Sequence, residues 1–418
     1  MFLFQELKWR NLIKNLSNEK KLEQLLNQGQ LNFYCGFDPT AISLTIGHLV
    51  QIITILLLQK KGHKPFILLG RATSLIGDPK EKEERKLLSL EDVEKNFFKI
   101  KKQLMKILPE DKVTFVDNYE WISKINLIDF LRDYGKYFNV NYMISKDKIA
   151  KRLDKGISYT EFSYMILQAV DFYFLYKKYN VNLQLGGSDQ WGNITAGLEL
   201  IRKKKFDESS EKPFGMSMSL LLDNKGVKIG KSEKNVIWLD EKITTSYQIY
   251  QFFLNVDDQN VINHLKMLTL LEVDKILELE KEVKMNPSYR LAQKELAKQV
   301  VSFVHGKEIF KECFEVNNIL FFNKSKALNE NDFVLLKKHL VFIEVKEKEI
   351  SLVDALLETK LADSKKQART LIISKSIKIF HKSIDKVDYV LDFDIALFSK
   401  YILLTKKNKI NALIIFKF

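Results

Sequence analysis

The stretch Leu185–Asn193 reads Leu-Gly-Gly-Ser-Asp-Gln-Trp-Gly-Asn, and the predicted fold is built outward from it. It follows a short extended run, Val181–Gln184, and precedes a helix-like run, Ile194–Lys204. The two glycines let the backbone approach a ligand closely, and Ser188 or Asp189 can cap the helix that follows. A strand, a glycine turn with a carboxylate and a helix suit the ribose of a nucleotide in a doubly wound sheet. An ordinary strand-to-helix connection is the alternative interpretation.

Length and composition indicate a globular protein of several domains. The 418 residues suggest two or three domains, and 46% hydrophobic and 29% charged residues are ordinary values. No uncharged apolar run reaches the roughly 18 residues that a membrane span requires, and Met1–Glu6 lacks a signal-peptide pattern. Two distant cysteines, Cys35 and Cys313, and six histidines without ligand spacing predict neither a disulfide framework nor a bound metal. These features predict a protein of the reducing cytoplasm.

The net charge is +14, from 67 Lys plus Arg against 53 Asp plus Glu. A basic balance favours a polyanionic partner, because phosphates attract basic proteins without sequence specificity. Compositional drift towards Lys, Ile, Asn and Phe in an AT-rich genome explains the charge equally well.

A strand–helix–strand unit predicts a parallel sheet near the N-terminus. Asn32–Phe37 and Phe66–Gly70 are apolar strands, and Gly47–Gly62 between them is long and apolar enough for a buried helix. Leu90–Leu108 then reads as an amphipathic helix and Val113–Val116 as a third strand. The fold class predicted is therefore α/β, with a Rossmann-like sheet.

The turn after the first strand has the residues of a phosphate cradle. Gly36 and Gly47 permit close backbone approach, while Thr40, Thr45 and His48 can donate hydrogen bonds near a helix N-terminus. The spacing matches neither a GxGxxG fingerprint nor a Walker A loop.

A second polar group is predicted on the helix Phe162–Tyr179. Tyr164, Gln168 and Asp171 share one face of this otherwise apolar helix, and a buried carboxylate is costly unless it is paired. Asp78, which follows the second strand, can converge on the same place, although it could equally be a turn residue. The three helix residues could form a closed buried network or a pocket for a ligand's ammonium or hydroxyl.

The stretch Val227–Glu233 contains Gly-Lys-Ser, but its glycine spacing excludes a P-loop. Lys228 and Lys231 instead suit a loop that brings point charges onto a triphosphate, with Ser232 beside them.

The second half of the chain divides into a helical region and a small basic module. Residues 246–322 read helical nearly throughout, with Ser288–Val304 and Gly306–Phe321 the clearest helices, and 324–348 reads as a charged linker. From residue 349 a compact αα-plus-β module is expected. It carries a basic face that favours phosphates, formed by Lys365, Lys366, Arg369, Lys406 and Lys407.

Taken together, these motifs resemble the bacterial-type tyrosyl-tRNA synthetases, a family of class I aminoacyl-tRNA synthetases, over nearly the whole chain. The most specific stretch is Gly-Gly-Ser-Asp-Gln-Trp-Gly-Asn, and the tail resembles an S4 RNA-binding module. The matching stretches are Tyr34–Ala41, Leu44–His48, Leu75–Pro79, Ser158–Asp171, Gly186–Thr195, Lys228–Glu233, Ile237–Asp240 and Ser364–Arg369.

The resemblance implies four segments and a set of partners. These are a catalytic domain over 1–222 whose helical insertion at about 119–160 forms a dimer interface, a basic loop with a helical domain over 223–323, a linker over 324–348, and an S4-like domain over 349–418. The implied substrates are L-tyrosine, ATP with Mg²⁺, and tRNA(Tyr), and the implied assembly is a homodimer without a structural metal.

The resemblance also implies residue roles. Thr45–His48 corresponds to the HIGH signature and Lys228–Ser232 to the KMSKS signature. The catalytic residues implied are Thr40, Thr45, His48, Lys228, Lys231 and Ser232. Tyr34 and Asp171 would bind the phenol hydroxyl of tyrosine, and Asp78, Tyr164 and Gln168 its ammonium, with Gln190 beside them. The nucleotide would lie against Gly36, Asp38, Gly47, His48, Gly187, Asp189 and Lys231. The basic face of the tail would bind tRNA.

The sequence departs from the family pattern at several positions. Thr45 stands where histidine is usual, Arg71 and Ser74 where glycines are usual, Lys80-Glu81 where Ser-Gly is usual, and Ser246 where proline is expected. Two alternatives therefore stay open, a synthetase for tryptophan and a catalytically reduced RNA-binding paralogue.

Overall fold

The computed structural model describes residues 1–29, 31–80, 83–204, 212–222, 226, 228–229, 236–321, 328–407 and 409–417. The chain forms two compact units, one of Met1–Thr244 with Phe253–Val300 and one of Thr245–Phe252 with Val301–Phe418. In the described residues, no helix is both long and apolar enough to cross a membrane.

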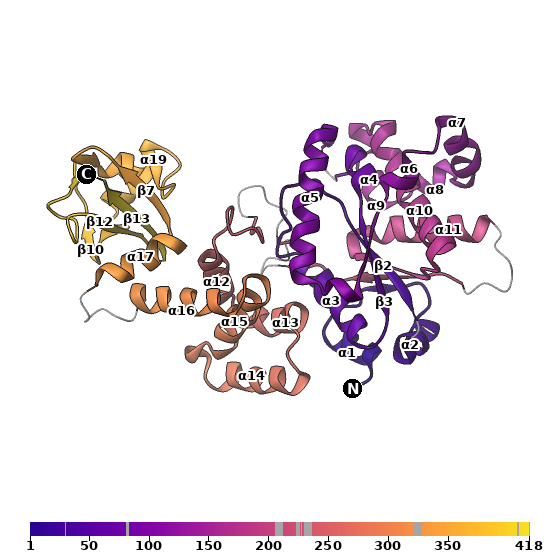
Figure 1. The fold of residues 1–418 in the computed structure, drawn as a ribbon, viewed down its shortest axis with the longest axis horizontal. Coiled ribbons are helices and arrows are strands. Elements are labelled where there is room, and N and C mark those ends of the chain that lie inside the picture. Colours follow the sequence, from indigo (N-terminus) through magenta and orange to yellow (C-terminus); the bar gives the residue numbers. More distant parts are fainter. Residues whose placement is uncertain are drawn as a thin grey trace. The chain divides into compact units, whose positions relative to one another are not determined.

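The first unit is built on a six-stranded sheet (Figure 1). Its order is β1-β6-β5-β2-β3-β4, and all neighbouring pairs are parallel except β1 with β6. The bounds are β1 Asn15–Leu16, β2 Asn32–Phe37, β3 Lys64–Leu69, β4 Thr114–Asp117, β5 Leu183–Gly187 and β6 Phe214–Met218. The predicted parallel sheet is confirmed. β6 pairs with β5 as far as Met218, so residues 219–222 lie beyond the strand.

Helices cover this sheet as crossovers between the parallel strands. α3 is buried on nearly all sides, as its apolar sequence requires, and α5 buries one stripe that includes Phe97. α11 follows β5 and packs against α10, β5 and β6. The helix bounds are α1 Leu3–Trp9, α2 Glu19–Gln28, α3 His48–Lys60, α4 Arg71–Ile76, α5 Leu90–Ile107, α10 Tyr159–Tyr179 and α11 Trp191–Lys203.

The strand order reverses direction at the pair β2 and β5. From β2 the chain proceeds outward to β3 and β4, and from β5 it proceeds the other way to β6. Loops at the carboxyl ends of two such strands diverge and leave a crevice, which is where doubly wound sheets bind ligands. The residues after Phe37 and Gly187 lie at this position.

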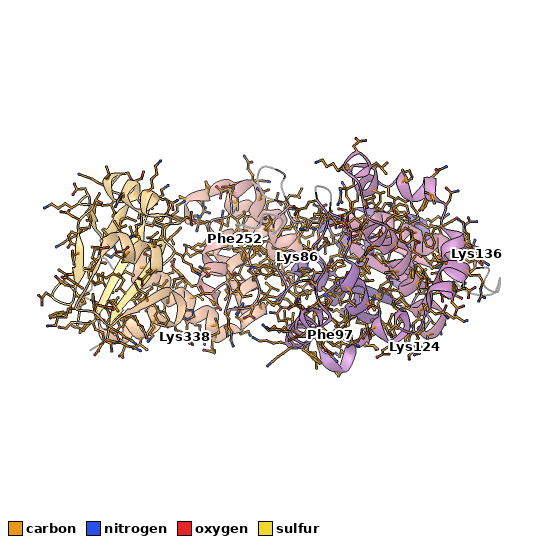
Figure 2. All side chains as sticks on the ribbon, turned by 90° about the horizontal axis from the view of Figure 1, so that it is seen from above. Lys86, Phe97, Lys124, Lys136, Phe252 and Lys338 are labelled. Carbon is orange, nitrogen blue, oxygen red and sulfur yellow. The ribbon has the colours of Figure 1, made fainter. Side chains whose placement is uncertain are left out.

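The insertion between β4 and α10 is helical but consists of short pieces. In this expected helical insertion, residues 127–137 form a short α-helical piece, a π-helical piece and a 3₁₀ piece. The aromatic residues Phe130, Tyr134 and Phe138 pack on the core. Figure 2 shows Lys124 and Lys136 at the outer surface of this region. The pieces are α6 Tyr119–Ile122, α7 Leu127–Asp129, Phe130–Tyr134, Gly135–Tyr137, α8 Val140–Ile144, α9 Asp147–Ala150 and Leu153–Lys155.

Residues 246–321, which belong to the region expected to be helical, are helical nearly throughout. The helix bounds are α12 Ser246–Leu254, α13 Asp258–Leu268, α14 Val273–Met285, α15 Leu291–His305 and α16 Lys307–Phe321. α15 begins later than the expected Ser288, because Pro287–Tyr289 forms a 3₁₀-turn and Arg290 has a φ of 51°.

The linker expected over 324–348 is wrong where the structure describes it. Residues Glu330–His339 form α17, which starts at a capping box of Asn329 and Asp332, and Val341–Val345 form β7. β7 pairs with β13, which lies about 70 residues further along the chain, so no local pattern announces it. Most β7 side chains are exposed, so its sequence shows no alternation of buried apolar and exposed polar residues of the kind that predicts a strand.

The C-terminal module has a five-stranded sheet of order β10-β9-β12-β13-β7 and a two-stranded pair β11-β8. Its two expected helices are present as α18 and α19, whose apolar faces fill one core with the strands. The bounds are β8 Glu349–Ser351, α18 Leu352–Glu358, α19 Lys365–Ile373, β9 Ile377–Ile379, β10 Lys382–Ile384, β11 Val390–Asp392, β12 Tyr401–Lys406 and β13 Ile410–Phe416.

Candidate active site

Asp38 follows β2 directly and binds residues from two other segments. Its Oδ2 accepts a hydrogen bond from Tyr164 Oη at 2.8 Å, and its Oδ1 accepts one from Thr73 Oγ1 at 2.9 Å. A Cβ on Gly70 would lie 1.9 Å from Asp38 Oδ1, so a larger residue there would force the carboxylate out of this position. Burial outweighs these hydrogen bonds and raises the pKa of Asp38 to about 6. The carboxyl end of β2 is therefore joined to α10.

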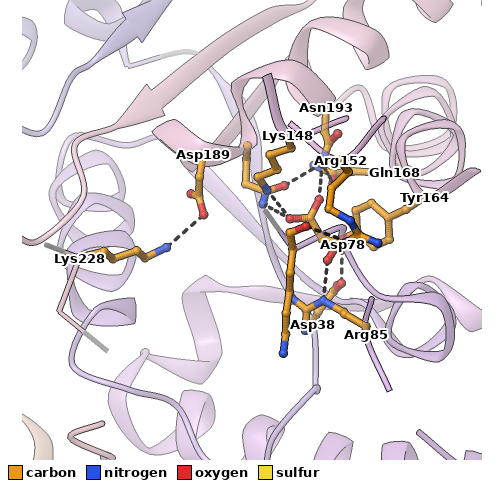
Figure 3. A network of polar contacts seen from close by, with 12 residues as sticks. Asp38, Asp78, Arg85, Lys148, Arg152, Tyr164, Gln168, Asp189, Asn193 and Lys228 are labelled. Atoms are coloured by element: carbon orange, nitrogen blue, oxygen red, sulfur yellow. Dashed lines mark hydrogen bonds and ion pairs between the residues drawn. The ribbon is translucent and has the colours of Figure 1, made fainter. Parts of the chain in front are cut away.

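Asp78 is the centre of a second polar group (Figure 3). Its Oδ1 accepts from Asn193 Nδ2 at 3.0 Å, and its Oδ2 accepts from Gln190 Nε2 at 3.1 Å and forms an ion pair with Lys148. Asn193 Nδ2 also lies 3.0 Å from Oε1 of Gln168. Asp78, Gln168 and Gln190 are thus brought together as predicted.

Two members of this group were not predicted. Asn193 lies three residues after Gln190 in the quoted glycine-rich stretch, so helical spacing could have identified it. Lys148 comes from α9 in the insertion, and no sequence signal connects it to Asp78.

Asp171 and Tyr34 form a buried polar group at the other end of the helix face. Asp171 accepts from Trp121 Nε1 at 2.8 Å and from Asn118 Nδ2 at 3.0 Å. Burial nevertheless raises the pKa of Asp171 to about 8, and burial together with the Asp171 charge raises that of Tyr34. The Tyr34 hydroxyl is buried and has no hydrogen-bond partner among the described residues. Trp121 and Asn118 belong to the insertion region and were also missed.

The two interpretations of the α10 face can now be compared. Tyr164, Gln168 and Asp171 each bond to a residue of a different segment, namely Asp38, Asn193 and the Asn118–Trp121 turn. The three side chains therefore do not form a closed network among themselves, which favours the interpretation of this face as a ligand pocket.

Thr45 and His48 are in direct contact at the start of α3. The Thr45 amide donates to His48 Nδ1 at 3.0 Å, and Thr45 Oγ1 lies 3.0 Å from the same nitrogen. Burial, with a further contribution from Lys228, lowers the pKa of His48 to about 4, so the ring is neutral at pH 7. Because Nδ1 accepts from an amide, the ring proton is assigned to Nε2.

The glycine turns of the two switch-point strands differ in what they require. A Cβ on Gly187 would lie 2.6 Å from Asp189 Oδ1, whereas Cβ atoms on Gly36 and Gly47 would meet their nearest neighbours at 3.9 and 3.6 Å. A larger residue at 187 would therefore force the Asp189 carboxylate to move, whereas the contacts at Gly36 and Gly47 are ordinary. Thr40 lies between these turns, where its amide donates to the carbonyl of Asp38 at 2.8 Å.

Lys228 and Asp189 join the basic loop to the turn after β5. Lys228 Nζ lies 3.0 Å from Asp189 Oδ2. Burial alone would raise the pKa of Asp189, but the charges of Lys228 and Lys148 outweigh it and hold that pKa below its ordinary value. The other two loop residues, Lys231 and Ser232, lie outside the described residues.

A cavity of about 690 Å³ adjoins this site, within the size range of small-molecule sites. It is lined by Asp78, Asp189 and Asn193 and by three lysines of the insertion, Lys146, Lys148 and Lys151. It therefore extends on the side of Asp78 and Asp189, where polar groups of both signs face each other. Among the described residues, no group of three or more His, Cys, Asp or Glu side chains could hold a metal ion.

The basic residues expected to bind tRNA lie at two places on the C-terminal module. Lys365, Lys366 and Arg369 are exposed on α19, although Lys365 pairs with Asp354 at 3.3 Å. Lys406 Nζ donates to the Leu361 carbonyl at 2.6 Å, and Lys407 lies in the turn after β12 with a φ of 51°. Lys406 is the least available of the five, because its amine is bound and partly buried.

A doubly wound parallel sheet with carboxylates and a neutral histidine at its switch point defines a nucleotide-binding enzyme fold. A family model narrows this class: the one described as "tRNA synthetases class I (W and Y)" matches residues 26–322. The model described as "Tyrosine--tRNA ligase SYY-like C-terminal domain" matches residues 332–414. This second match begins inside α17, in agreement with the corrected boundary of the module.

Individual relatives agree over the full length. The chain is 55% identical over 417 residues to the tyrosine–tRNA ligase of Aster yellows witches'-broom phytoplasma, covering 100% of both chains. It is 42% identical to tyrosine–tRNA ligase 1 of Bacillus subtilis over 421 residues, covering 99% of each. The solved structure of a C-terminally truncated mitochondrial tyrosyl-tRNA synthetase from Aspergillus nidulans is 29% identical, with a TM-score of 0.69, and covers 77% of this chain and 94% of its own. The chain belongs to the tyrosine–tRNA ligase family of class I synthetases.

Proposed function

We propose that the protein activates L-tyrosine with ATP to tyrosyl-adenylate and pyrophosphate, and then transfers the tyrosyl group to the 3′-terminal adenosine of tRNA(Tyr). The observation that carries the choice of amino acid is the unpartnered Tyr34 hydroxyl beside Asp171. An orphaned buried hydroxyl costs free energy, and the phenol hydroxyl of tyrosine would satisfy it. Phenylalanine would leave Tyr34 and Asp171 without that partner. A site built to bind a substrate hydroxyl rejects the analogue that lacks it, and this enzyme family is a standard example of such rejection.

The remaining contacts to the amino acid follow from its polarity. Asp78 supplies the negative charge for the α-ammonium, with Gln168 and Gln190 held beside it through Asn193. Tyr164 donates to Asp38 and thereby stands between the ammonium site and the nucleotide site. These groups fix the amino acid with its carboxylate towards the nucleotide.

The nucleotide lies across the switch point in this proposal. Asp189 accepts from the ribose, Asp38 lies where the amino acid and the nucleotide meet, and the turns at Gly36, Gly47 and Gly187 let the backbone approach. The tyrosine carboxylate attacks the α-phosphate in line, and pyrophosphate leaves with the Mg²⁺ that accompanied ATP. No covalent enzyme intermediate is needed, because positioning and charge stabilisation suffice.

Donors for the transferring group come from two segments. Thr40 lies in the turn after β2. Thr45 and His48 lie at the start of α3, where neutral His48 can donate from Nε2. Lys228 approaches from the basic loop, and we assign the same task to Lys231 with Ser232 assisting. Each donor acts on charge that develops during the reaction.

The proposal extends to RNA and to a second subunit. Lys365, Lys366, Arg369, Lys406 and Lys407 would contact tRNA phosphates, in keeping with the net charge of +14. The insertion exposes a group of apolar side chains that suits a homodimer interface, namely Leu127, Ile128, Leu131 and Val140. A cytoplasmic location fits the two buried cysteines, Cys35 and Cys313, which are free thiols.

The experiment that tests the proposal is ATP–pyrophosphate exchange measured with each amino acid. Tyrosine should support exchange, with phenylalanine and tryptophan at least about 100-fold less effective. Efficient exchange with tryptophan would instead favour the tryptophan synthetase alternative. Lack of any exchange, with tRNA binding intact, would make the protein an RNA-binding paralogue.

A further inference from the structure

Lys148 occupies a position in the active site that the proposed reaction does not explain. It lies on α9 in the insertion, and its amine forms an ion pair with Asp78 Oδ2 (Figure 3). Both side chains are mostly buried, with 21% and 15% of their surface exposed. A protected pair of this kind is more than a solvated surface contact.

The environment of Asp78 leaves little room for a second cation. Oδ2 is shared by Lys148 and Gln190, and Oδ1 accepts from Asn193. A lysine side chain ends in an ammonium group with three donors and one positive charge, and so does the α-amino end of an amino acid. The lysine therefore meets the same requirement of Asp78 as a substrate ammonium would.

Two features allow Lys148 to leave this position. The amine lies beside the cavity of about 690 Å³ that Asp78 and Asp189 also line, so its four-carbon stem has space in which to rotate. Asp189 already feels the charge of Lys148, so a second carboxylate is near enough to attract it.

A separate ion pair anchors the insertion independently of Lys148. Arg152 pairs with Glu161 at 3.1 Å, and these side chains are only 3% and 1% exposed. Arg152 also donates to the backbone carbonyls of Lys80 and Glu83 at 3.0 and 2.7 Å. Displacement of Lys148 therefore leaves the attachment of the insertion to the loop after Asp78 in place.

We propose that Lys148 is an internal competitor for the amino-acid ammonium site: it pairs with Asp78 in the free enzyme and is displaced when a ligand brings its own ammonium group. This inference rests on the proposed role of Asp78. It makes Lys148 a specificity-determining residue, because a ligand without an ammonium group cannot displace the lysine and gains nothing from its removal.

The test compares three ligands that share the phenol ring. Tyrosine has both an ammonium and a carboxylate, tyramine has only the ammonium, and 3-(4-hydroxyphenyl)propanoate has only the carboxylate. Their dissociation constants would be measured calorimetrically on the full chain, with Lys148→Met and Lys148→Gln as two uncharged variants. Thermal midpoints would identify any variant that does not fold.

We expect tyrosine and tyramine to bind either uncharged variant about 10-fold more tightly than the wild type. This is the gain expected if Lys148 leaves Asp78 free in only about a tenth of the wild-type molecules. The affinity for 3-(4-hydroxyphenyl)propanoate should stay the same or fall. Lys148→Arg keeps the positive charge. It should therefore bind the ligands with wild-type affinities, or bind tyramine more weakly than the wild type does. The matched control is Lys146→Met, which removes a cation from the same cavity without touching Asp78, and should leave the ratio of tyramine to propanoate affinity unchanged.

An equal change for all three ligands, or weaker tyramine binding in both uncharged variants, would overturn the competition. A parallel variant, Asp78→Asn, separates this outcome from failure of the proposed function. If Asp78→Asn weakens tyramine but not the propanoate, the ammonium site stands and only the role of Lys148 is in question. If Asp78→Asn affects neither ligand, the assignment of the ammonium site itself is wrong.

Discussion

The amine of Lys228 lies 3.0 Å from Oδ2 of Asp189, so the basic loop touches the turn after β5 (Figure 3). The same lysine helps to hold the pKa of the buried His48 near 4. Lys228 is therefore close to Asp189, the proposed acceptor from the ribose, and to His48, the proposed hydrogen-bond donor to the phosphate. Direct contact between its amine and the triphosphate would require Lys228 to leave Asp189.

Lys228→Met should lower kcat for tyrosine-dependent pyrophosphate exchange roughly 100-fold, the usual effect of losing one preorganised donor to transition-state charge. The KM for tyrosine should change little, because Lys228 makes no contact with the Asp78 group. Steady-state exchange kinetics measure both constants. Lys242→Met, at an exposed position, is the control and should match the wild type. An unchanged kcat in Lys228→Met would remove this lysine from the catalytic set.

Tyr34→Phe should reduce the discrimination between tyrosine and phenylalanine by roughly 3- to 10-fold, the value of one hydrogen bond. The Tyr34 ring packs against Phe172 with centroids 5.4 Å apart, so its loss of only the hydroxyl should preserve the packing. The ratio of kcat/KM for the two amino acids gives the measurement. Tyr159→Phe removes a hydroxyl from a tyrosine that is 64% exposed, and its ratio should stay at the wild-type value. Equal ratios in both variants would count against a phenol site at Tyr34.

Asp171 predicts how stability depends on pH. Burial raises its folded pKa to about 8, so the folded protein holds a proton near pH 7 that the unfolded chain has already lost. Stability should therefore fall between pH 7 and pH 8, by about 1 kcal/mol or roughly 2 °C in thermal midpoint. Asp38, with a pKa of about 6, and His48, at about 4, contribute mainly below this window.

The comparison of Asp171→Asn with the wild type isolates that contribution. The variant should lose the fall in thermal midpoint between pH 7 and pH 8, since it has no proton to release. Asp133→Asn should keep the fall, because Asp133 is exposed and its pKa is held low by Arg132. A pH slope that survives in Asp171→Asn would assign it to another group.

Thr45→His should raise the rate of adenylate formation by about 10-fold, if a longer donor recovers roughly 1–1.5 kcal/mol of transition-state stabilisation. Thr45 Oγ1 lies 3.0 Å from His48 Nδ1, so the hydroxyl is already engaged with the histidine. Single-turnover adenylation is the measurement. Thr45→Val keeps the shape without the hydroxyl and should be slower than the wild type. An unchanged or lower rate in Thr45→His would show that the threonine is already compensated.

The sequence predicted those parts of the fold and site whose determinants are local. Asn32–Phe37 is mostly apolar and was predicted residue for residue as β2. Asp78 could be placed near the Tyr164–Asp171 face because it follows the second strand of the predicted parallel sheet, whereas Gln190 was placed there by the family resemblance. Lys148 and Trp121 could not be found in this way, because they reach the site from irregular short helices. Their contacts to Asp78 and Asp171 join residues 70 and 50 positions apart in the chain.

The boundary of the C-terminal module was missed for the same physical reason, and it changes how the module should be removed. A truncation after residue 349 would retain α17 and β7 but delete β13, the partner of β7. It would also remove Tyr401, whose ring stacks on the fully buried Phe333 with the two ring centroids 4.7 Å apart. We expect this shortened chain to have a lower thermal midpoint or to aggregate.

A truncation after residue 321 removes α17 and the whole sheet together, and should give the cleaner separation of functions. Tyrosine-dependent pyrophosphate exchange should stay within a few-fold of the full chain, because the groups around Asp38, Asp78 and Asp171 are all retained. Charging of tRNA should fall roughly 100-fold, the order expected when several phosphate contacts are lost. In the full-length chain, Lys366→Glu with Arg369→Glu should reproduce most of that loss without affecting exchange, whereas Lys338→Glu on α17 should not. Equal loss of exchange and charging in the truncated protein would mean that the module supports the catalytic unit, and not only the binding of tRNA.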